Sequence, residues 1–243
     1  MIKSAIPVLV TRAEPGASET VARLTDLGLR AIKTPVMHVI ASAEMILPNT
    51  SQFAGLIFTS ANGVRAFADR SKNRSQTAWC VGPATAAAAR EAGFAQVEES
   101  AGDARDLAAY VGERCHPDTK PMLHIANAAA KGDLKQVLEG LGFDVVFCPL
   151  YKMERAVSLS DKAIDILKSE SKSIIFAHSE KGAAAFVALS QGLPLQNLKA
   201  VAISERAAAP LIQAGLTGIE IAPTPNEDGL FKALHKAVAT LSA

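Results

Sequence analysis

Three stretches of the 243-residue chain occur twice, and their order differs between the two copies. LIFTSANGVRAF aligns with IFAHSEKGAAAF, so that Ser60 corresponds to Ser179, 119 residues later. VGPATAAAAREAGF aligns with ISERAAAPLIQAGL, 122 residues later, and LVTRAEPGASETVARLTDLGLRAIKTPVM aligns with LHIANAAAKGDLKQVLEGLGFDVVFCPLY, 114 residues later. In the third pair the outer copy lies at the N-terminus rather than at the end. The pattern therefore predicts two related lobes, of which one is circularly permuted and carries the other as an insertion.

Short apolar or β-branched runs alternate with alanine-rich segments of helical length along almost the whole chain. This alternation predicts βα units and parallel sheets, that is, an α/β fold. Ten strands are many for one sheet, so we expect two sheets of five. The predicted strands cover residues 7–11, 30–34, 55–59, 78–82, 95–99, 121–126, 143–148, 173–178, 199–204 and 218–222.

The permuted repeat also sets the expected domain boundaries. We expect a discontinuous outer lobe of residues 1–36 and 153–243, and an inserted inner lobe of residues 41–148. Inter-lobe linker strands are expected at residues 37–40 and 149–152. Two connections of this kind permit hinge motion about a cleft.

Charge and hydropathy argue against several classes of partner. The chain carries 25 Lys and Arg against 24 Asp and Glu, so no global field attracts nucleic acid or a membrane surface. No apolar run reaches the length of a membrane span, and MIKSAIPVLVTR is too short and too soon polar for a signal peptide, so we expect a cytoplasmic protein. Cys80, Cys115 and Cys148 lack CxxC spacing, and we expect reduced thiols and no metal site.

Hydroxyl, amide and glycine residues follow most of the predicted strands. In open α/β sheets ligands bind beyond the carboxyl ends of the strands, where helix N-termini present free N–H groups to carboxylates or phosphates. Taken singly, Ser60 and Ser179 are typical helix caps. Because both lobes present such ends, the functional alternative is a ligand with several acidic groups.

Other motifs and side chains are less informative. The chain has no GxGxxG after a strand, no GxxxxGK[ST], no HExxH and no GxSxG, so nucleotide-binding, metalloprotease and hydrolase functions lose their usual support. His124 and His178 are expected to pack or to face solvent, and Asp103 and Asp106 resemble a helix cap and a first-turn acid. Tyr151 lies at a predicted crossing between lobes, where its phenol either enters the cleft or bonds to backbone in an interface.

The chain resembles the uroporphyrinogen-III synthases in six stretches, which keep the order and spacing of that family: VLVTRAEP, LIFTSANGVRAF, VGPATAAAAREAGF, GDARDLAAYV, KGDLKQVLEGLGFDVVFCPLYK and VAISERAAAPLIQAGL. The resemblance covers nearly the whole chain, and FTSANGVRAF with VGPAT is its most specific part. It implies two flavodoxin-like lobes with parallel sheets, joined by a two-stranded linker.

The resemblance also implies an activity, that of a cyclising lyase of tetrapyrrole (haem-type) biosynthesis that uses neither cofactor nor metal. The substrate would be hydroxymethylbilane, a linear tetrapyrrole with eight carboxylates. Its closure to uroporphyrinogen III inverts ring D and releases water. We expect a monomer that binds neither nucleic acid nor membrane, and the pathway allows a transient contact with hydroxymethylbilane synthase.

Individual residues take roles from the same resemblance. Tyr151 matches the linker tyrosine of the family and is the candidate to hydrogen-bond or protonate the leaving hydroxyl. Because an ordinary phenol has a pKa near 10, we favour positioning over full proton transfer. The implied substrate-binding residues are Arg12, Thr59, Ser60, Asn62, Gly82, Thr85, Lys131, Ser179 and Ser204. The chain departs from the family in ANAAAKGDL, where many members carry a sequence rich in arginine and glycine, and at Ala207, where many members carry threonine.

Two other functions stay open. A two-lobed small-molecule binding module would also present a cleft, although such modules are expected to carry a signal peptide or an attached DNA-binding segment. An inactive paralogue retained for interaction is the second, because the departures near Lys131 and at Ala207 fall in expected binding segments.

Overall fold

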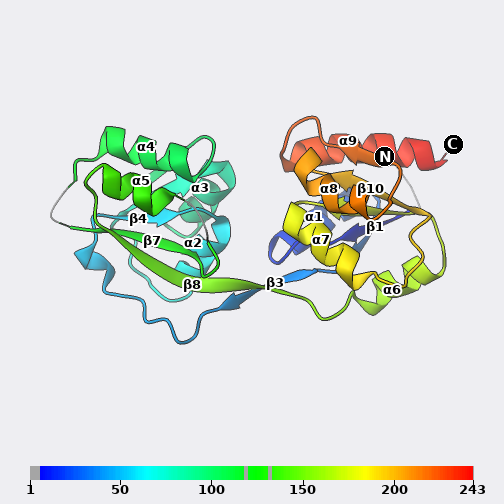
Figure 1. Cartoon of the computed structure of the whole chain (residues 1–243), viewed down its shortest axis with the longest axis horizontal. Helices are drawn as coiled ribbons and strands as arrows, with labels where there is room; N and C mark the ends of the chain where they lie inside the picture. Colours follow the sequence, from blue (N-terminus) through cyan, green and yellow to red (C-terminus); the bar gives the residue numbers. More distant parts are fainter. Residues whose placement is uncertain (1–5, 118–119, 131–132, 243) are drawn as a thin grey trace. The chain divides into compact units, whose positions relative to one another are not determined.

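The computed structural model describes residues 6–117, 120–130 and 133–242, and its elements form two compact units (Figure 1). The outer unit comprises Met1–His38 with Glu154–Ala243, and the inner unit comprises Val39–Met153. Both boundaries fall inside strands, namely β3 (Met37–Ala41) and β8 (Val145–Arg155). The predicted α/β class with two parallel sheets is confirmed.

The outer unit contains a five-stranded parallel sheet between two layers of helices. The strand order is β11 (Ile219–Ile221), β10 (Leu198–Ala202), β9 (Ser173–Ala177), β1 (Pro7–Val10) and β2 (Arg30–Lys33). One face packs on α1 (Gly16–Asp26) and α9 (Glu227–Ser242), and the other on α6 (Asp161–Lys168), α7 (Glu180–Leu189) and α8 (Glu205–Gln213).

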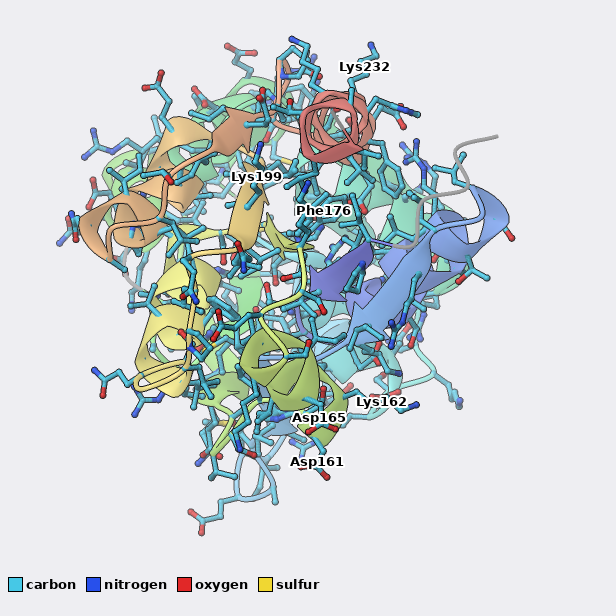
Figure 2. All side chains as sticks on the ribbon, turned by 90° about the vertical axis from the view of Figure 1, so that its right-hand side faces the viewer. Asp161, Lys162, Asp165, Phe176, Lys199 and Lys232 are labelled. Carbon is cyan, nitrogen blue, oxygen red and sulfur yellow. The ribbon has the colours of Figure 1, made fainter. Side chains whose placement is uncertain are left out.

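Burial in the outer unit follows from the alternation of side chains along each strand. Val8 and Val10 face α1 and α9, whereas Leu9 faces the opposite layer, and all three are fully buried. Figure 2 shows Phe176 in the interior below α9, with Lys232 on the outer face of that helix. The strands read as continuous apolar runs because helices cover both faces.

The inner unit contains a six-stranded sheet. Its order is β3, β8, β7 (Met122–Asn127), β4 (Gly55–Phe58), β5 (Thr77–Val81) and β6 (Val97–Ser100). One face packs on α2 (Ala61–Ala68) and α3 (Gly82–Glu91), and the other on α4 (Ala104–Arg114) and α5 (Leu134–Gly140). A short 3₁₀ helix, Thr50–Gln52, precedes β4.

The outer sheet and β4 to β8 of the inner sheet have the same strand order once the strands of one unit are renumbered by circular permutation. Taken along the chain, the outer sheet has the flavodoxin-like order 2-1-3-4-5, and β4 to β8 of the inner sheet have the order 3-2-1-4-5. The registers agree as well: Val8 pairs with Ile174 in the outer sheet, and Met122 pairs with Gly55 in the inner sheet. These pairs are related by the offsets of 114 and 119 residues found in the sequence repeats, so the repeats align positions that are structurally equivalent.

Observed strands differ from the predicted ones mainly at their ends. β5 stops at Val81, and Gly82 opens α3 with a φ of +71°, a left-handed conformation that favours glycine. β8 contains most of the predicted strand 143–148, and it continues without a break through residues 149–152, which were expected as a separate linker strand, to Arg155. It passes Pro149 because the register with β7 shifts there, and such irregularities tolerate a residue without an N–H. β3 adds a sixth strand to a sheet for which we expected five.

Candidate functional site

The hydroxyl groups of Ser60 and Tyr151 form a hydrogen bond within the inner unit, with Oγ and Oη 2.6 Å apart. Ser60 follows β4 and caps α2, where its Oγ also accepts from the backbone N–H of Gly63 at 3.3 Å. Tyr151 reaches it from β8, just after the register shift that pairs Asn127 with Tyr151 instead of Leu150. An irregularity of this kind redirects the side chains that follow it along the strand. The structure thus brings together two residues that lie 91 positions apart in the sequence.

Tyr151 is only 4 % exposed. Burial raises the pKa of its phenol, and the hydrogen bond with Ser60 lowers it by less, so the net pKa lies above the ordinary value. The phenol therefore stays protonated at neutral pH and has one proton to donate. If Ser60 donates to Oη, the phenolic proton is free for another acceptor.

The remaining inner candidates occupy the helices that follow β4 and β5, two neighbouring strands. Asn62 lies in the first turn of α2 and is partly exposed, and Gly82 opens α3 with open space where a Cβ would be. Thr85 is 4 % exposed inside α3, so little of its side chain is accessible. Lys131 lies outside the described residues.

A cavity of about 270 Å³ lies in the inner unit, between the sheet and the starts of α4 and α5. Its walls are Thr59, Ala104, His124, Ala130, Leu134, Lys135 and Phe147. His124 is 7 % exposed, and burial lowers its pKa to about 4, so the imidazole is neutral at physiological pH. Its Nε2 has no hydrogen-bond partner among the described residues.

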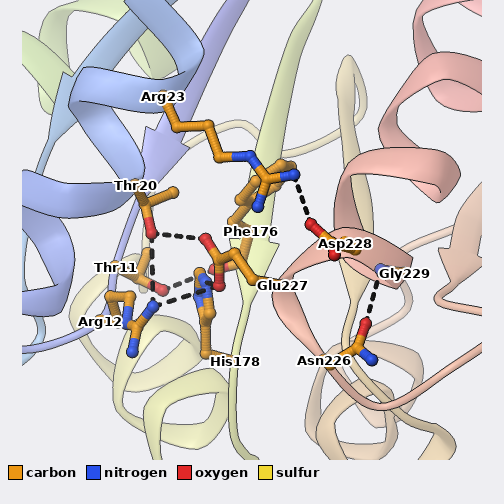
Figure 3. Close-up of polar contacts among 10 residues, drawn as sticks. All are labelled: Thr11, Arg12, Thr20, Arg23, Phe176, His178, Asn226, Glu227, Asp228 and Gly229. Atoms are coloured by element: carbon orange, nitrogen blue, oxygen red, sulfur yellow. Dashed lines mark hydrogen bonds and ion pairs between the residues drawn. The ribbon is translucent and has the colours of Figure 1, made fainter. Parts of the chain in front are cut away.

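In the outer unit three polar side chains meet around the carboxylate of Glu227, the first residue of α9 (Figure 3). Arg12 donates from Nη1 to Oε2 at 3.1 Å, and Thr20 donates from Oγ1 to Oε1 at 2.7 Å. His178, which follows β9, places Nε2 3.3 Å from Oε2. Gly16 makes room for the guanidinium, because a Cβ there would lie 2.4 Å from Arg12 Nε.

The charges of this cluster are set by burial and by mutual contact. Burial alone would raise the pKa of Glu227, but its contacts with His178, Thr20 and Arg12 lower it to about 2. Burial is also the main cause that lowers the pKa of His178, only partly opposed by Glu227. We infer an ionised carboxylate, a charged guanidinium and a neutral imidazole at pH 7. The side chain of Arg12 stays 35 % exposed, so part of its donor fork faces outward.

Ser179 and Ser204 are helix caps in the outer unit. Ser179 Oγ accepts from Gly182 N at 3.1 Å, and Ser204 Oγ accepts from Ala207 N at 3.2 Å. Their extended backbone angles nearly equal those of Ser60. Ser60 differs because it alone among these three caps has a tyrosine hydroxyl as a second partner in the described structure.

A larger cavity of about 560 Å³ lies in the outer unit, near the amino ends of β1 and β2 and beside α6. Lys162 and Asp165, labelled on α6 in Figure 2, belong to its walls. None of the residues selected from the sequence lines it. The expected edge for ligands is the opposite one, where strands end.

The other expectations from composition can be compared directly with the structure. Cys80, Cys115 and Cys148 are free thiols, as predicted. Asp103 caps α4 and forms a reciprocal capping box with Asp106, which confirms their assignment. Among the described residues no helix has both the length and the apolar character needed to cross a membrane.

Comparison with known proteins identifies the family. A sequence model of the family described as uroporphyrinogen-III synthase HemD matches residues 18–232. The chain belongs to the uroporphyrinogen-III synthase family. The resemblance read from the sequence is therefore confirmed.

Two relatives of this synthase family are similar over part of their length. The porphyrin biosynthesis protein HemD of Ruminiclostridium josui is 26 % identical over 216 residues, which cover 83 % of this chain and 42 % of that protein. The uroporphyrinogen-III synthase of Chlorobaculum parvum is 36 % identical over 87 residues, which cover 32 % of this chain and 35 % of that protein. The chain thus spans less than half the length of either relative.

Solved structures of synthases share the fold. The uroporphyrinogen-III synthetase of Helicobacter pylori superimposes with a TM-score of 0.66 at 18 % identity, covering 95 % of this chain and 99 % of that one. A mutant uroporphyrinogen III synthase of Thermus thermophilus superimposes with a TM-score of 0.54 at 14 % identity, covering 97 % and 100 %.

The sequence analysis missed the partners of Arg12. His178 was expected to pack or to face solvent, and Thr20 and Glu227 were not selected. A signal was available, because aligning the segments that precede Leu107 and Leu230 places Glu227 opposite Ala104. An acidic residue in only one copy of a repeat, together with an arginine at a strand end of the same lobe, indicates an internal ion pair.

Proposed function

We propose that this chain is a uroporphyrinogen-III synthase in activity as well as in family, closing hydroxymethylbilane with inversion of ring D and loss of water. The observation that carries the proposal is the family match over residues 18–232, which includes every strand of the two sheets except β1. A binding module or an inactive paralogue is not favoured by any of the comparisons.

Tyr151 is the proposed donor to the leaving hydroxyl. The C–O bond of the terminal hydroxymethyl group breaks, the departing oxygen takes up a proton as water, and an azafulvene forms on ring A. The substituted carbon of ring D then attacks to give a spiro intermediate, whose reopening and closure invert that ring. A phenol with a raised pKa supports this role as a hydrogen-bond donor rather than as a strong acid.

Strand-end residues of both units are the proposed carboxylate ligands. In the inner unit Thr59, Ser60, Asn62, Gly82 and Thr85 belong to the loops and helix starts after β4 and β5. Helix N-termini and hydroxyls bind carboxylates without a formal charge. A substrate with many acidic groups is held by many modest contacts, and folding it toward closure is a proximity effect.

Arg12 is the proposed charged ligand of the outer unit, with Ser179 and Ser204 as further contacts. A guanidinium carries five N–H groups. Nη1 of Arg12 donates to Thr20 and Glu227, which leaves other donors of the partly exposed group for a substrate carboxylate. The proposal also includes lobe boundaries at residues 36/41 and 148/153. We further propose a monomeric state, a cytoplasmic location and a transient contact with hydroxymethylbilane synthase. No cofactor is included in it.

To test this, the purified chain is incubated with porphobilinogen and hydroxymethylbilane synthase. The products are then oxidised and the porphyrin isomers are separated. We expect type III porphyrin at a rate proportional to the concentration of the chain. Type I porphyrin alone, the product of spontaneous closure, would refute the activity. Heat-treated protein is the control for uncatalysed closure.

A further inference from the structure

Equivalent positions of the two units carry different types of side chain. In the outer sheet Val10 pairs with Phe176, and in the inner sheet the equivalent His124 pairs with Ile57. The helices α9 and α4 begin equivalently, since Asn226 accepts from Gly229 N and Asp103 caps α4. The register of the strands and these helix starts let the surroundings of Glu227 be compared position by position with those of the inner cavity.

At this position the outer unit contains the carboxylate of Glu227, and the inner unit contains the cavity of about 270 Å³. Glu227, Thr20 and His178 form the outer arrangement, in which three side chains surround one carboxylate. The inner residues at these three positions are Ala104, Leu134 and Thr59. All three line the cavity of about 270 Å³. The cavity therefore occupies the position of the glutamate side chain that the inner copy lacks.

The geometry points to this cavity as the subsite for one carboxylate-bearing arm of the substrate. Methylene groups of the arm pack against Phe147 and Leu134, and its carboxylate takes donors from the Thr59 hydroxyl and the Lys135 ammonium. The inference rests on the proposed function for the identity of the ligand.

Size and polarity agree with an arm rather than with a whole ligand. Pockets for drug-sized molecules occupy roughly 300–1,000 Å³, and this cavity of about 270 Å³ is smaller. Its walls are mostly apolar, but Thr59 and Lys135 supply two donors, and His124 brings a buried imidazole whose Nε2 has no partner among the described residues. Lys135 lies 3.5 Å from Glu139 in an exposed pair, which a ligand carboxylate can replace at little cost.

The test uses sodium propionate as the probe and needs no turnover. Propionate is titrated into the chain labelled at alanine methyl groups and histidine rings, with sodium chloride at equal ionic strength as control. We expect saturable NMR shifts at Ala104 and His124, with a dissociation constant on the order of millimolar for so small a ligand. Absence of saturable shifts at both residues overturns the inference.

Two variants test whether the cavity contributes to binding of the substrate. Ala104→Leu fills the cavity, and Ala87→Leu on the exposed face of α3 is the matched control. We expect Ala104→Leu to abolish the propionate shifts and to raise KM for hydroxymethylbilane about tenfold with little change in kcat, which is the pattern of lost ground-state binding. An unchanged KM in a folded Ala104→Leu variant overturns the inference and leaves the synthase activity intact.

The outer unit provides an internal check. Glu227→Ala opens the equivalent space while Arg12, Thr20 and His178 remain as donors. We expect propionate to raise the melting temperature of this variant more than that of the wild type. Equal stabilisation of both proteins would remove the basis of the comparison. If type III porphyrin is not formed at all, the titrations still decide whether the cavity binds a carboxylate.

Discussion

Replacing Ser60 by alanine removes two interactions at once, and their sizes follow from the structure. Loss of a serine cap costs about 1 kcal/mol. The same change leaves the hydroxyl of Tyr151, in a residue that is 4 % exposed, without its 2.6 Å partner. An orphaned buried hydroxyl costs a further 1–3 kcal/mol or so. We therefore expect Ser60→Ala to lower the free energy of unfolding by about 2–4 kcal/mol.

Ser179→Ala is the matched control for the cap. Ser179 has nearly the same backbone angles as Ser60 and accepts from the corresponding glycine N–H, but its described contacts include no tyrosine. It should cost only about 1 kcal/mol. Tyr151→Phe should cost about 1 kcal/mol alone, and added to Ser60→Ala it should recover stability because no hydroxyl is left orphaned.

The measurement is urea denaturation of the wild type and the four variants, each followed by fluorescence and by circular dichroism. Coincidence of the two probes establishes whether one transition describes both units. Equal losses for Ser60→Ala and Ser179→Ala, or additive effects of Ser60→Ala and Tyr151→Phe, would refute the reasoning. Either result would mean that the hydroxyl contact contributes no net energy.

Three further outcomes are expected. Tyr151→Phe should reduce kcat about 10- to 100-fold in the coupled porphyrin assay. This reduction lies at or below the range usual for loss of a general acid, because the phenol mainly positions the leaving group. An unchanged kcat would show that Tyr151 has no role in the reaction. Glu227→Gln should lower the free energy of unfolding by about 1–2 kcal/mol at pH 7. This is less than the free energy that corresponds to a shift of the carboxylate pKa from 4.5 to about 2, because the side chain is 29 % exposed. That loss should shrink as the pH falls from 4.5 toward 2, since a lowered pKa stabilises only where the unfolded carboxyl is also ionised. Denaturation curves that give the same difference at pH 7 and pH 3 would contradict this. Gly16→Ala should displace the flexible end of Arg12, changing the melting temperature by only a few degrees but raising KM, and a wild-type KM would exclude Arg12 as a ligand.

The strands could be predicted because they are buried on both faces, which leaves short apolar runs between alanine-rich helices. Leu9 and Phe58 illustrate this, since both are fully buried members of such runs. β3, with the sequence MHVIA, is half exposed and is therefore not distinguished from a linker by its pattern. β8 was predicted as two strands divided at Pro149, because the compensating register shift depends on the neighbouring strand.

The helix caps of the site could be predicted from local sequence, but the side chains that converge on them could not. Ser60 precedes a helix start, which is a local signal, whereas its contact with Tyr151 depends on pairing of β8 with β7 and of β7 with β4. Likewise Thr20 and Glu227 are 207 residues apart, and only the packing of α1 and α9 on the same face of the outer sheet brings them together. Residue types indicate which chemistry is available, and tertiary contacts decide which groups meet.

The interrupted outer unit has a consequence for synthesis on the ribosome. β1 pairs with β9, and the bond from Thr11 Oγ1 to the carbonyl of Phe176 joins residues 165 positions apart. At about 5–20 residues per second, the nascent N-terminal segment waits roughly 8–30 s for that partner. The inner unit is encoded without interruption and is synthesised during this wait, so it folds while the apolar β1 is still unpaired. Translation rate and chaperone supply therefore bear on the yield of the outer unit more than on that of the inner one.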